Sequence, residues 1–301
     1  MNRIIKKVTA TALSLALLAG TGMISNNFAF GNNTAITVSA ASAKSVIINN
    51  VIYREYGSYV EVSGCRSTTS SITIPAKINN KPVVSIDSYA FSYSSYLENV
   101  TINADIEYIE EGTFKNCRNL KTVTLPDSLE VIWQGAFSGC SNLKTLILPY
   151  NTTHVSSSAL YGCTRLQNIV VPNKNTFIST AVFKHPTLST TSEFCGRITC
   201  LKGSLAERMA KLRGHRYSSY SLGDVNNDGV VNVMDASAIL SAYTALSTGG
   251  TITSTQAKLW VTADVDHDGR INASDASCVL SYASKAGTGY TGTFEQFMAT
   301  R

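Results

Sequence analysis

The chain has 301 residues, of which 44% are hydrophobic and 15% are charged, and its formal net charge is +5. This length accommodates two modest domains beside a targeting segment, and the hydrophobic content is sufficient for packed cores. The lysines and arginines form no cluster of the kind that binds nucleic acid, so we exclude nucleic acid as a partner.

The first 43 residues have the pattern of a secretory signal. Three basic residues among the first seven precede an uncharged stretch over residues 8–20, and small residues at 38–43 offer a cleavage site near Ala40 or Ala43. The apolar stretch is shorter than the roughly 20 residues that a membrane crossing needs. We therefore expect a cleaved signal peptide, a secreted, extracellular product and no membrane span after cleavage. An N-terminal anchor that is not cleaved is the alternative.

A repeat of 23 residues follows. Its clearest copy runs from Ile132 to Pro149. The recurring positions are Phe91, Phe114, Phe137, Leu160 and Phe183; Leu97, Leu120, Leu143 and Leu166; Cys117, Cys140 and Cys163; and Pro126, Pro149 and Pro172. One such unit cannot bury its own apolar face, whereas stacked units form continuous internal columns. The period therefore predicts a solenoid.

Each repeat contains a short predicted strand, over residues 122–125, 145–148 and 168–171, that a proline closes. The outward positions form a neutral, Thr-rich face, which is either a ligand surface or ordinary β-surface. These positions are Asn99, Thr101, Thr122, Thr124, Thr145, Ile147, Asn168 and Val170.

The cysteines number seven, so at least one is a free thiol or forms an intermolecular bond. We interpret the three that recur at the repeat period as core filling rather than as metal or redox groups. Cys195 and Cys200 are close enough in sequence for a hairpin bridge.

The repeats resemble those of the BspA-like leucine-rich repeat surface proteins, above all in Gly-Ala-Phe-Ser-Gly-Cys-Ser-Asn-Leu-Lys-Thr-Leu-Ile-Leu-Pro at 135–149. Residues 71–86 are similar to that family's opening unit, and residues 203–215 to its closing helix and strand. Ser204 can cap this helix, and Glu207, three residues later, stands at the position that completes a capping box. The resemblance covers residues 44–220 and implies a fold and a binding habit, but no chemistry.

Catalytic patterns are missing from this region of the sequence. His154, His185 and His215 are scattered, no nucleophile or metalloprotease motif is present, and Glu110 and Glu111 fit a solvated turn. We therefore predict that the protein is not an enzyme.

Residues 221–289 contain two 12-residue loops at a spacing of 40 residues, with oxygen donors at positions 1, 3, 5, 9 and 12 and glycine (Gly229, Gly269) at position 6. Calcium takes about 6–8 oxygen ligands, and a wrapping chain can supply them. All seven acidic residues between 221 and 289 stand at these positions, so the pattern predicts two Ca²⁺ ions. Zinc is disfavoured because every donor is oxygen. The predicted ligands are Asp224, Asn226, Asp228, Asn232 and Asp235 with the carbonyl of Val230, and Asp264, Asp266, Asp268, Asn272 and Asp275 with the carbonyl of Arg270.

One helix follows each loop, over residues 233–243 and 273–285, and no helix is evident that leads directly into the first loop at Gly223. Val231 and Ile271 at position 8 can tie the two loops together through the core. A sensor that opens by moving an entering and an exiting helix is therefore not expected.

This duplicated loop and helix resembles the type I dockerin family, a small all-α domain of paired F-hands. The resemblance implies calcium-dependent binding to the cohesin domain of a scaffoldin, within the cellulosomes that degrade polysaccharide. The family's partner-contacting positions correspond to Val233, Met234, Leu240 and Ser241 in the first copy, and to Ala273, Ser274, Leu280, Ser281 and Lys285 in the second. Leu240 and Leu280 have an alternative interpretation as helix core. The Ser-Thr and Lys-Arg pairs of the best-known members are absent, which leaves the cohesin class open.

The predicted fold is α+β: a signal peptide (1–43), a leucine-rich repeat solenoid (44–220), a dockerin (221–289) and a tail (290–301) in which Phe294 and Phe297 can pack back on the dockerin. We expect a secreted, non-catalytic adaptor, associated with a cellulosome or the cell surface, whose repeats bind protein or glycan. The alternatives are a cell-surface adhesin and a cellulosomal enzyme with an unrecognised site.

Overall fold

The computed structural model describes residues 43–66, 69–184, 194–248 and 257–301. Nearly all of the predicted signal peptide, and His185, lie outside these ranges. None of the helices in the described ranges combines the length and hydropathy that a bilayer crossing requires.

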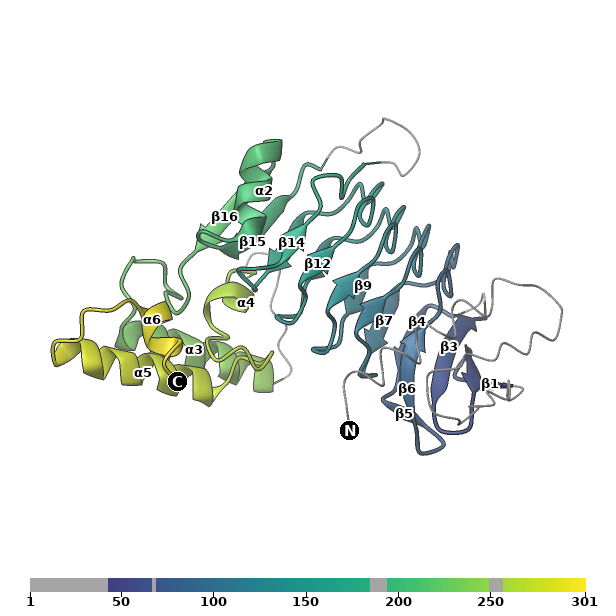
Figure 1. The fold of residues 1–301 in the computed structure, drawn as a ribbon, viewed down its shortest axis with the longest axis horizontal. Helices are drawn as coiled ribbons and strands as arrows, with labels where there is room; N and C mark the ends of the chain where they lie inside the picture. Colours follow the sequence, from purple (N-terminus) through teal and green to yellow (C-terminus); the bar gives the residue numbers. More distant parts are fainter. Residues whose placement is uncertain (1–42, 67–68, 185–193, 249–256) are drawn as a thin grey trace, which may run out of the picture. The chain divides into compact units, whose positions relative to one another are not determined.

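A five-stranded sheet opens the described chain, in the order β1-β2-β3-β6-β5 (Figure 1). Its first three strands are antiparallel, and β3 pairs with β6 in parallel. This change of direction starts the parallel stacking of the repeats. The strands are β1 (Lys44–Ile48), β2 (Val51–Glu55), β3 (Val60–Cys65), β5 (Lys77–Ile78) and β6 (Lys81–Ile86).

The repeats form a solenoid with parallel strands on two sides, as predicted (Figure 1). Partners in the central repeats are 23 residues apart, as in Val100 with Val123 and Val131 with His154. One side contains β4 (Ser71–Ile74), β7 (Asn99–Ile102) and β9 (Thr122–Thr124), and then β11 (Thr145–Ile147), β13 (Asn168–Val171), β15 (Arg197–Leu201) and β16 (Arg216–Tyr220). The other contains β8 (Tyr108–Ile109), β10 (Val131–Ile132), β12 (His154–Val155) and β14 (Phe177–Ile178).

The recurring side chains form the internal columns that the period predicts. Phe91, Phe114 and Phe137 are fully buried and stack with ring centroids 5.2 and 5.3 Å apart. Each repeated thiol donates to a carbonyl of the preceding repeat, for example Cys140 to Phe114 O at 3.1 Å. The column therefore satisfies a weak polar group inside an apolar core. All seven cysteines are free, including Cys195.

Helix α2 (Leu205–Arg213) closes the solenoid, and Ser204 is its N-cap, as expected. The Ser204 side chain accepts a hydrogen bond from Glu207 N. The Glu207 carboxylate accepts from Gly203 N, one residue ahead of the N–H that a capping box would use. The carboxylate also accepts from the Ser219 hydroxyl of β16, so it joins the helix to the last strand.

The remaining elements are helical: α3 (Val233–Ser247), α4 (Leu259–Thr262), α5 (Ala273–Gly287) and α6 (Phe294–Met298). Helices α3 and α5 pack together, and both run a few residues longer than the sequence predicts. The short helix α4 ahead of the second loop was not anticipated, because four residues are too few to show a period. Ile271 is buried in the core of this region and Val231 packs against it, as expected for position 8.

One expectation about the repeat surface is wrong. Asn168 and Val170 were assigned to the outward column, but they are only 6% and 0% exposed. Val170 and Leu201 share a hydrophobic cluster with Val261, Ile239 and other residues of the helical region, and Ile147 packs against that cluster. The helical region therefore covers part of the outer face of the last repeats.

The buried thiols generate a prediction about reactivity. Burial raises the pKa of Cys117 and Cys163 to about 12, and raises the pKa of Cys140 well above its ordinary value. Because the thiolate is the reactive form, iodoacetamide at about pH 8 should modify the exposed Cys195 in the folded protein and leave these three intact until denaturant is added. Peptide mass spectrometry measures this, and rapid modification of Cys140 in the native protein would contradict the packing described.

Candidate functional site

Positions 9 and 12 of each loop also start the helix that follows. Asn232 and Asn272 are the N-caps of α3 and α5, and Asp235 and Asp275 complete a capping box with each of them. Asn232 Oδ1 accepts from Met234 N at 2.7 Å, and Asp235 Oδ2 accepts from Asn232 N at 2.9 Å. The same residues that would ligate a cation therefore fix where the helix begins.

The aspartate at position 12 joins the two ends of each loop. Asp235 Oδ1 accepts from Val225 N at 2.8 Å, and Asp275 Oδ1 accepts from Val265 N at 2.8 Å. Asp235 and Asp275 are both 0% exposed. A short side chain is enough here because the start of the helix lies directly against residues 225 and 265.

The aspartate at position 1 of each loop accepts a hydrogen bond from the glycine at position 6 and so stabilises the turn there. In the first loop, Asp224 Oδ2 accepts from Gly229 N at 3.1 Å, and in the second, Asp264 Oδ2 accepts from Gly269 N at 3.1 Å. Both glycines have positive φ, 89° and 83°, which a residue with a side chain rarely adopts. In each loop, the carboxylate at position 1 therefore lies inside the turn and accepts a hydrogen bond from the glycine at position 6.

The second loop gathers three carboxylates. Asp264, Asp266 and Asp268 each place an oxygen within 4.8 Å of the others. Asp264 Oδ1 is buried and has no hydrogen-bond partner. Burial, and then the charges of Asp275, Asp268 and Asp266, raise the pKa of Asp264 to about 7. A buried, unpartnered anion among like charges is costly unless a cation lies beside it. The donors are oxygen throughout, so the loop fits Ca²⁺.

The side-chain ligands of the two loops differ by one negative charge. Asn226 stands at position 3 of the first loop, and Asp266 stands there in the second. In the first loop, Asn226 Oδ1 accepts from Asp228 N at 2.8 Å, and Asp266 Oδ1 accepts from Asp268 N at 3.3 Å in the second. The turn at position 3 is therefore the same in both loops, and a carboxylate in the second loop replaces the amide of the first.

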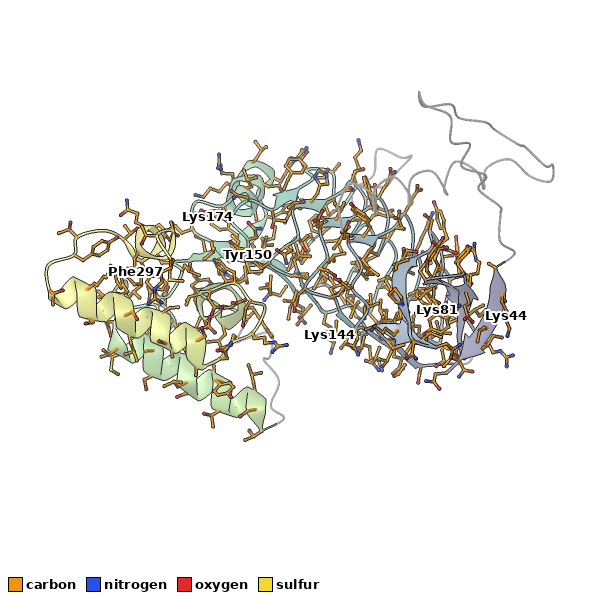
Figure 2. All side chains as sticks on the ribbon, turned by 60° about the horizontal axis from the view of Figure 1, so that its bottom comes forward. Lys44, Lys81, Lys144, Tyr150, Lys174 and Phe297 are labelled. Atoms are coloured by element: carbon orange, nitrogen blue, oxygen red, sulfur yellow. The ribbon has the colours of Figure 1, made fainter. Side chains whose placement is uncertain are left out.

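The second loop also contacts the repeats, which the sequence analysis did not predict. The His267 ring stacks on Tyr150, with centroids 3.8 Å apart and planes 10° from parallel. A Cβ at Gly269 would lie 2.8 Å from Asp127 Oδ1. Figure 2 labels Tyr150, and it also labels Lys174, whose ammonium lies 2.6 Å from Glu295 of α6.

A signal for this contact is present in the sequence. The outward column contains Thr101 and Thr124 in the earlier repeats, and then changes to Ile147 and Val170. Apolar residues at successive outward positions mark a surface that another element covers.

The helix faces expose most of the predicted partner-contacting side chains. Val233 is 57% exposed, Met234 63%, Leu240 41% and Leu280 45%. Ser241, Ala273, Ser274 and Lys285 are also exposed, and Ser281 is half-buried. The structure excludes the interpretation of Leu240 and Leu280 as core, because Ile239 and Val279 fill the interior instead.

The second face is engaged by the end of the chain. Arg301 donates to the Ser281 hydroxyl at 3.0 Å, and the Lys285 ammonium lies 5.3 Å from the centre of the Phe297 ring. Phe294 and Phe297 are buried against this region, as the sequence analysis expected, and Phe297 is labelled in Figure 2. On the first face, the Ser241 hydroxyl donates only within its own helix, to Ser237 O.

The charge difference between the loops predicts unequal calcium affinities. Neutralising Asp266 (Asp266→Asn) should weaken calcium binding at the second loop on the order of tenfold, because ligand charge tunes affinity in such loops. The reverse change, Asn226→Asp, should strengthen binding at the first loop by a similar factor. Titration calorimetry of the full chain measures both, and two variants that leave both affinities unchanged would contradict the assignment.

Comparison with known proteins identifies both regions. Residues 63–190 match the BspA type leucine rich repeat region in six copies, and residues 222–282 match the dockerin type I domain. No curated protein matches the sequence.

Several solved leucine-rich repeat structures are similar to the chain. A leucine rich repeat protein of T. pallidum has 14% identity and a TM-score of 0.43, over 61% of this chain and 98% of that one. A leucine rich cell surface protein of Faecalibacterium prausnitzii has 26% identity and a TM-score of 0.35, over 42% of this chain and 38% of that one. A leucine-rich repeat protein of Bacteroides capillosus has 20% identity and a TM-score of 0.34, over 37% of this chain and 87% of that one.

Type I dockerin domains typically bind calcium and imply a cohesin partner. The two family matches confirm both resemblances seen in the sequence. The chain therefore contains a region that matches the BspA type leucine rich repeats, followed by a region that matches the dockerin type I domain.

Proposed function

We propose that the protein is a secreted, non-catalytic adaptor, which docks onto a scaffoldin cohesin through its dockerin and presents the repeats as a binding module. The observation that carries this proposal is the pair of oxygen-lined loops, each continuous with a helix that exposes apolar side chains. Exposed apolar residues beside a rigid, ion-filled loop make a preorganised docking surface.

Two calcium ions are part of the proposal. The first would be held by Asp224, Asn226, Asp228, Asn232 and Asp235 with the carbonyl of Val230, and the second by Asp264, Asp266, Asp268, Asn272 and Asp275 with the carbonyl of Arg270. When bound, calcium supplies charge neutralisation and no chemistry. The work of these residues is to order the loop and to fix the first turn of each helix.

The first helix face is the docking face in this proposal. Val233, Met234 and Leu240 form an apolar surface there, and nearby Tyr243 is 42% exposed. The matching positions of the second copy are Ala273 and Ser274, which offer less apolar area, and the Arg301 contact already uses Ser281. Two near-identical faces could each bind a partner in reversed orientation, but these two are unequal.

The dockerin and the BspA-type repeats support association with an extracellular cellulosome or a cell surface. Within that setting, the repeats would recruit a protein or a glycan for polysaccharide degradation. Neither family match is to a catalytic domain.

Paired aspartate substitutions test the proposal. Met234→Asp should weaken binding to a panel of scaffoldin cohesins at least tenfold, because it places a charge in a desolvated apolar contact. Ser274→Asp, the matched control on the other copy, should change binding by less than about twofold. Surface plasmon resonance in calcium gives both affinities, and excess chelator should abolish binding of the unsubstituted chain.

Two results would overturn the proposal. Equal weakening by both substitutions would remove the preference for one face. Undiminished cohesin binding in excess chelator would remove the role of calcium.

A further inference from the structure

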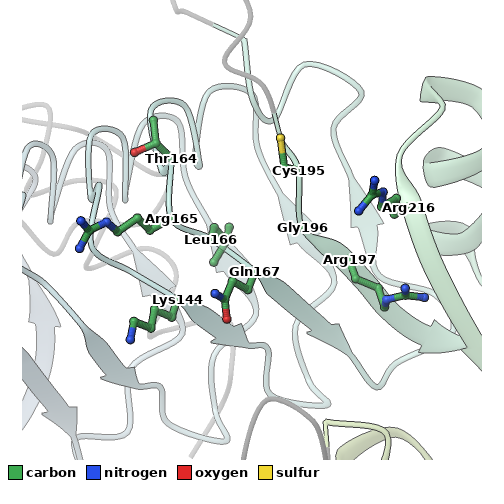
Figure 3. Close-up of a pocket in the computed structure, with 9 residues that line it drawn as sticks. All are labelled: Lys144, Thr164, Arg165, Leu166, Gln167, Cys195, Gly196, Arg197 and Arg216. Atoms are coloured by element: carbon green, nitrogen blue, oxygen red, sulfur yellow. The ribbon is translucent and has the colours of Figure 1, made fainter.

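A groove crosses the solenoid where its last strands begin. It has a volume of about 580 Å³, and its lining includes Lys144, Arg165, Gln167, Arg197 and Arg216 (Figure 3). Four of these five side chains are cationic, and none of the described residues that line the groove is acidic. All five are exposed to solvent.

The four cations lack carboxylate partners within the described ranges. None of the five ion pairs found there includes any of them. Arg197 donates to the Ser218 hydroxyl at 2.5 Å, and Arg165 donates to Asn142 Oδ1 at 2.7 Å. These neutral acceptors orient the guanidinium groups without neutralising them, so their charge is available to a ligand.

Two of the cations are direct neighbours across a pair of strands. Arg197 of β15 is in register with Arg216 of β16. Like charges on neighbouring positions of two paired strands are destabilising. An anion between the two guanidinium groups would offset this repulsion.

The groove continues along the strands. A second hollow of about 370 Å³ shares Gln167 and Arg197 with the first, and it adds Asn168, Thr199, Tyr220 and Lys258. Cationic, hydroxyl and amide residues therefore line the groove over several strands, which lie about 4.8 Å apart; of these, Asn168 and Thr199 are buried and hydrogen-bonded to each other. Such an elongated, polar lining fits a polymer with repeating anionic and hydroxyl groups.

The lining discriminates among polyanions. Single-stranded nucleic acid needs a series of aromatic platforms, and Tyr220 is the one aromatic side chain among the residues that line the two hollows. A flexible acidic peptide would lose conformational entropy on binding, and a groove without pockets for apolar side chains would offset little of that cost. A stiff chain of uronic acids loses less conformational entropy on binding. Its carboxylates can pair with the cationic residues of the groove, and its hydroxyls can bond to the hydroxyl and amide residues.

We propose that this groove binds a carboxylate-bearing polysaccharide, with Arg197 and Arg216 as the principal contacts and Lys144 and Arg165 extending the site. The inference rests on the proposed role of the repeats as a binding module, and it names the ligand class of that module. None of its four cationic contacts is a predicted calcium ligand or partner-contacting residue, so it can be tested separately from cohesin docking.

The test uses the full chain in calcium, with tetragalacturonate as the probe and its methyl ester as the uncharged control. Titration calorimetry should detect binding of the acid and at least tenfold weaker binding of the ester. The double variant Arg197→Ala/Arg216→Ala should lose at least tenfold in affinity for the acid. The matched variant Arg208→Ala/Arg213→Ala removes two exposed charges from α2 and should retain the affinity of the unsubstituted chain.

Each other outcome overturns the inference. Equal binding of acid and ester would make the groove a neutral-glycan site or no site. Equal losses of affinity in the two double variants would mean that only the net charge of the protein matters. Tighter binding of an oligoglutamate peptide than of tetragalacturonate would mean that the groove binds acidic protein segments. Cohesin affinity, measured in parallel, should be unchanged in both variants, so a failure here is distinguishable from a failure of the docking proposal.

Discussion

The mutual repulsion of carboxylates in the dockerin loops is the constraint on which the helical region depends. Asp264 is buried beside Asp266, Asp268 and Asp275, and one of its oxygens has no partner. The loop residues at positions 9 and 12 also cap α3 and α5. Relief of the repulsion by a cation is therefore coupled to the start of both helices and to the exposed faces that those helices present.

The second of these loops also contacts the repeats. The second loop stacks His267 on Tyr150, and Gly269 leaves room for Asp127. Val170 and Leu201 belong to the hydrophobic cluster of the helical region. These contacts join the second loop and the helical region to residues of the last repeats.

Much of this architecture is predictable from the sequence, because it depends on periodicity and on fixed ligand spacing. The stacked Phe114 and Phe137 follow from the 23-residue period, and the acceptors at Asp224 and Asp264 follow from the loop pattern. The burial of Val170 and the arginine pair at 197 and 216 were missed. Both depend on which strands become neighbours and on what covers them, and neither property is local. The break in the Thr column at Ile147 was the available signal.

Hydrogen exchange of the full chain, with calcium and with excess chelator, tests the central claim most directly. Folding coupled to calcium predicts that amides of α3 and α5 lose their protection in chelator, while those of β7 and β13 in the solenoid keep theirs. Equal protection of α3 and α5 in the two conditions would contradict it, because the helices would then form without relief of the carboxylate repulsion.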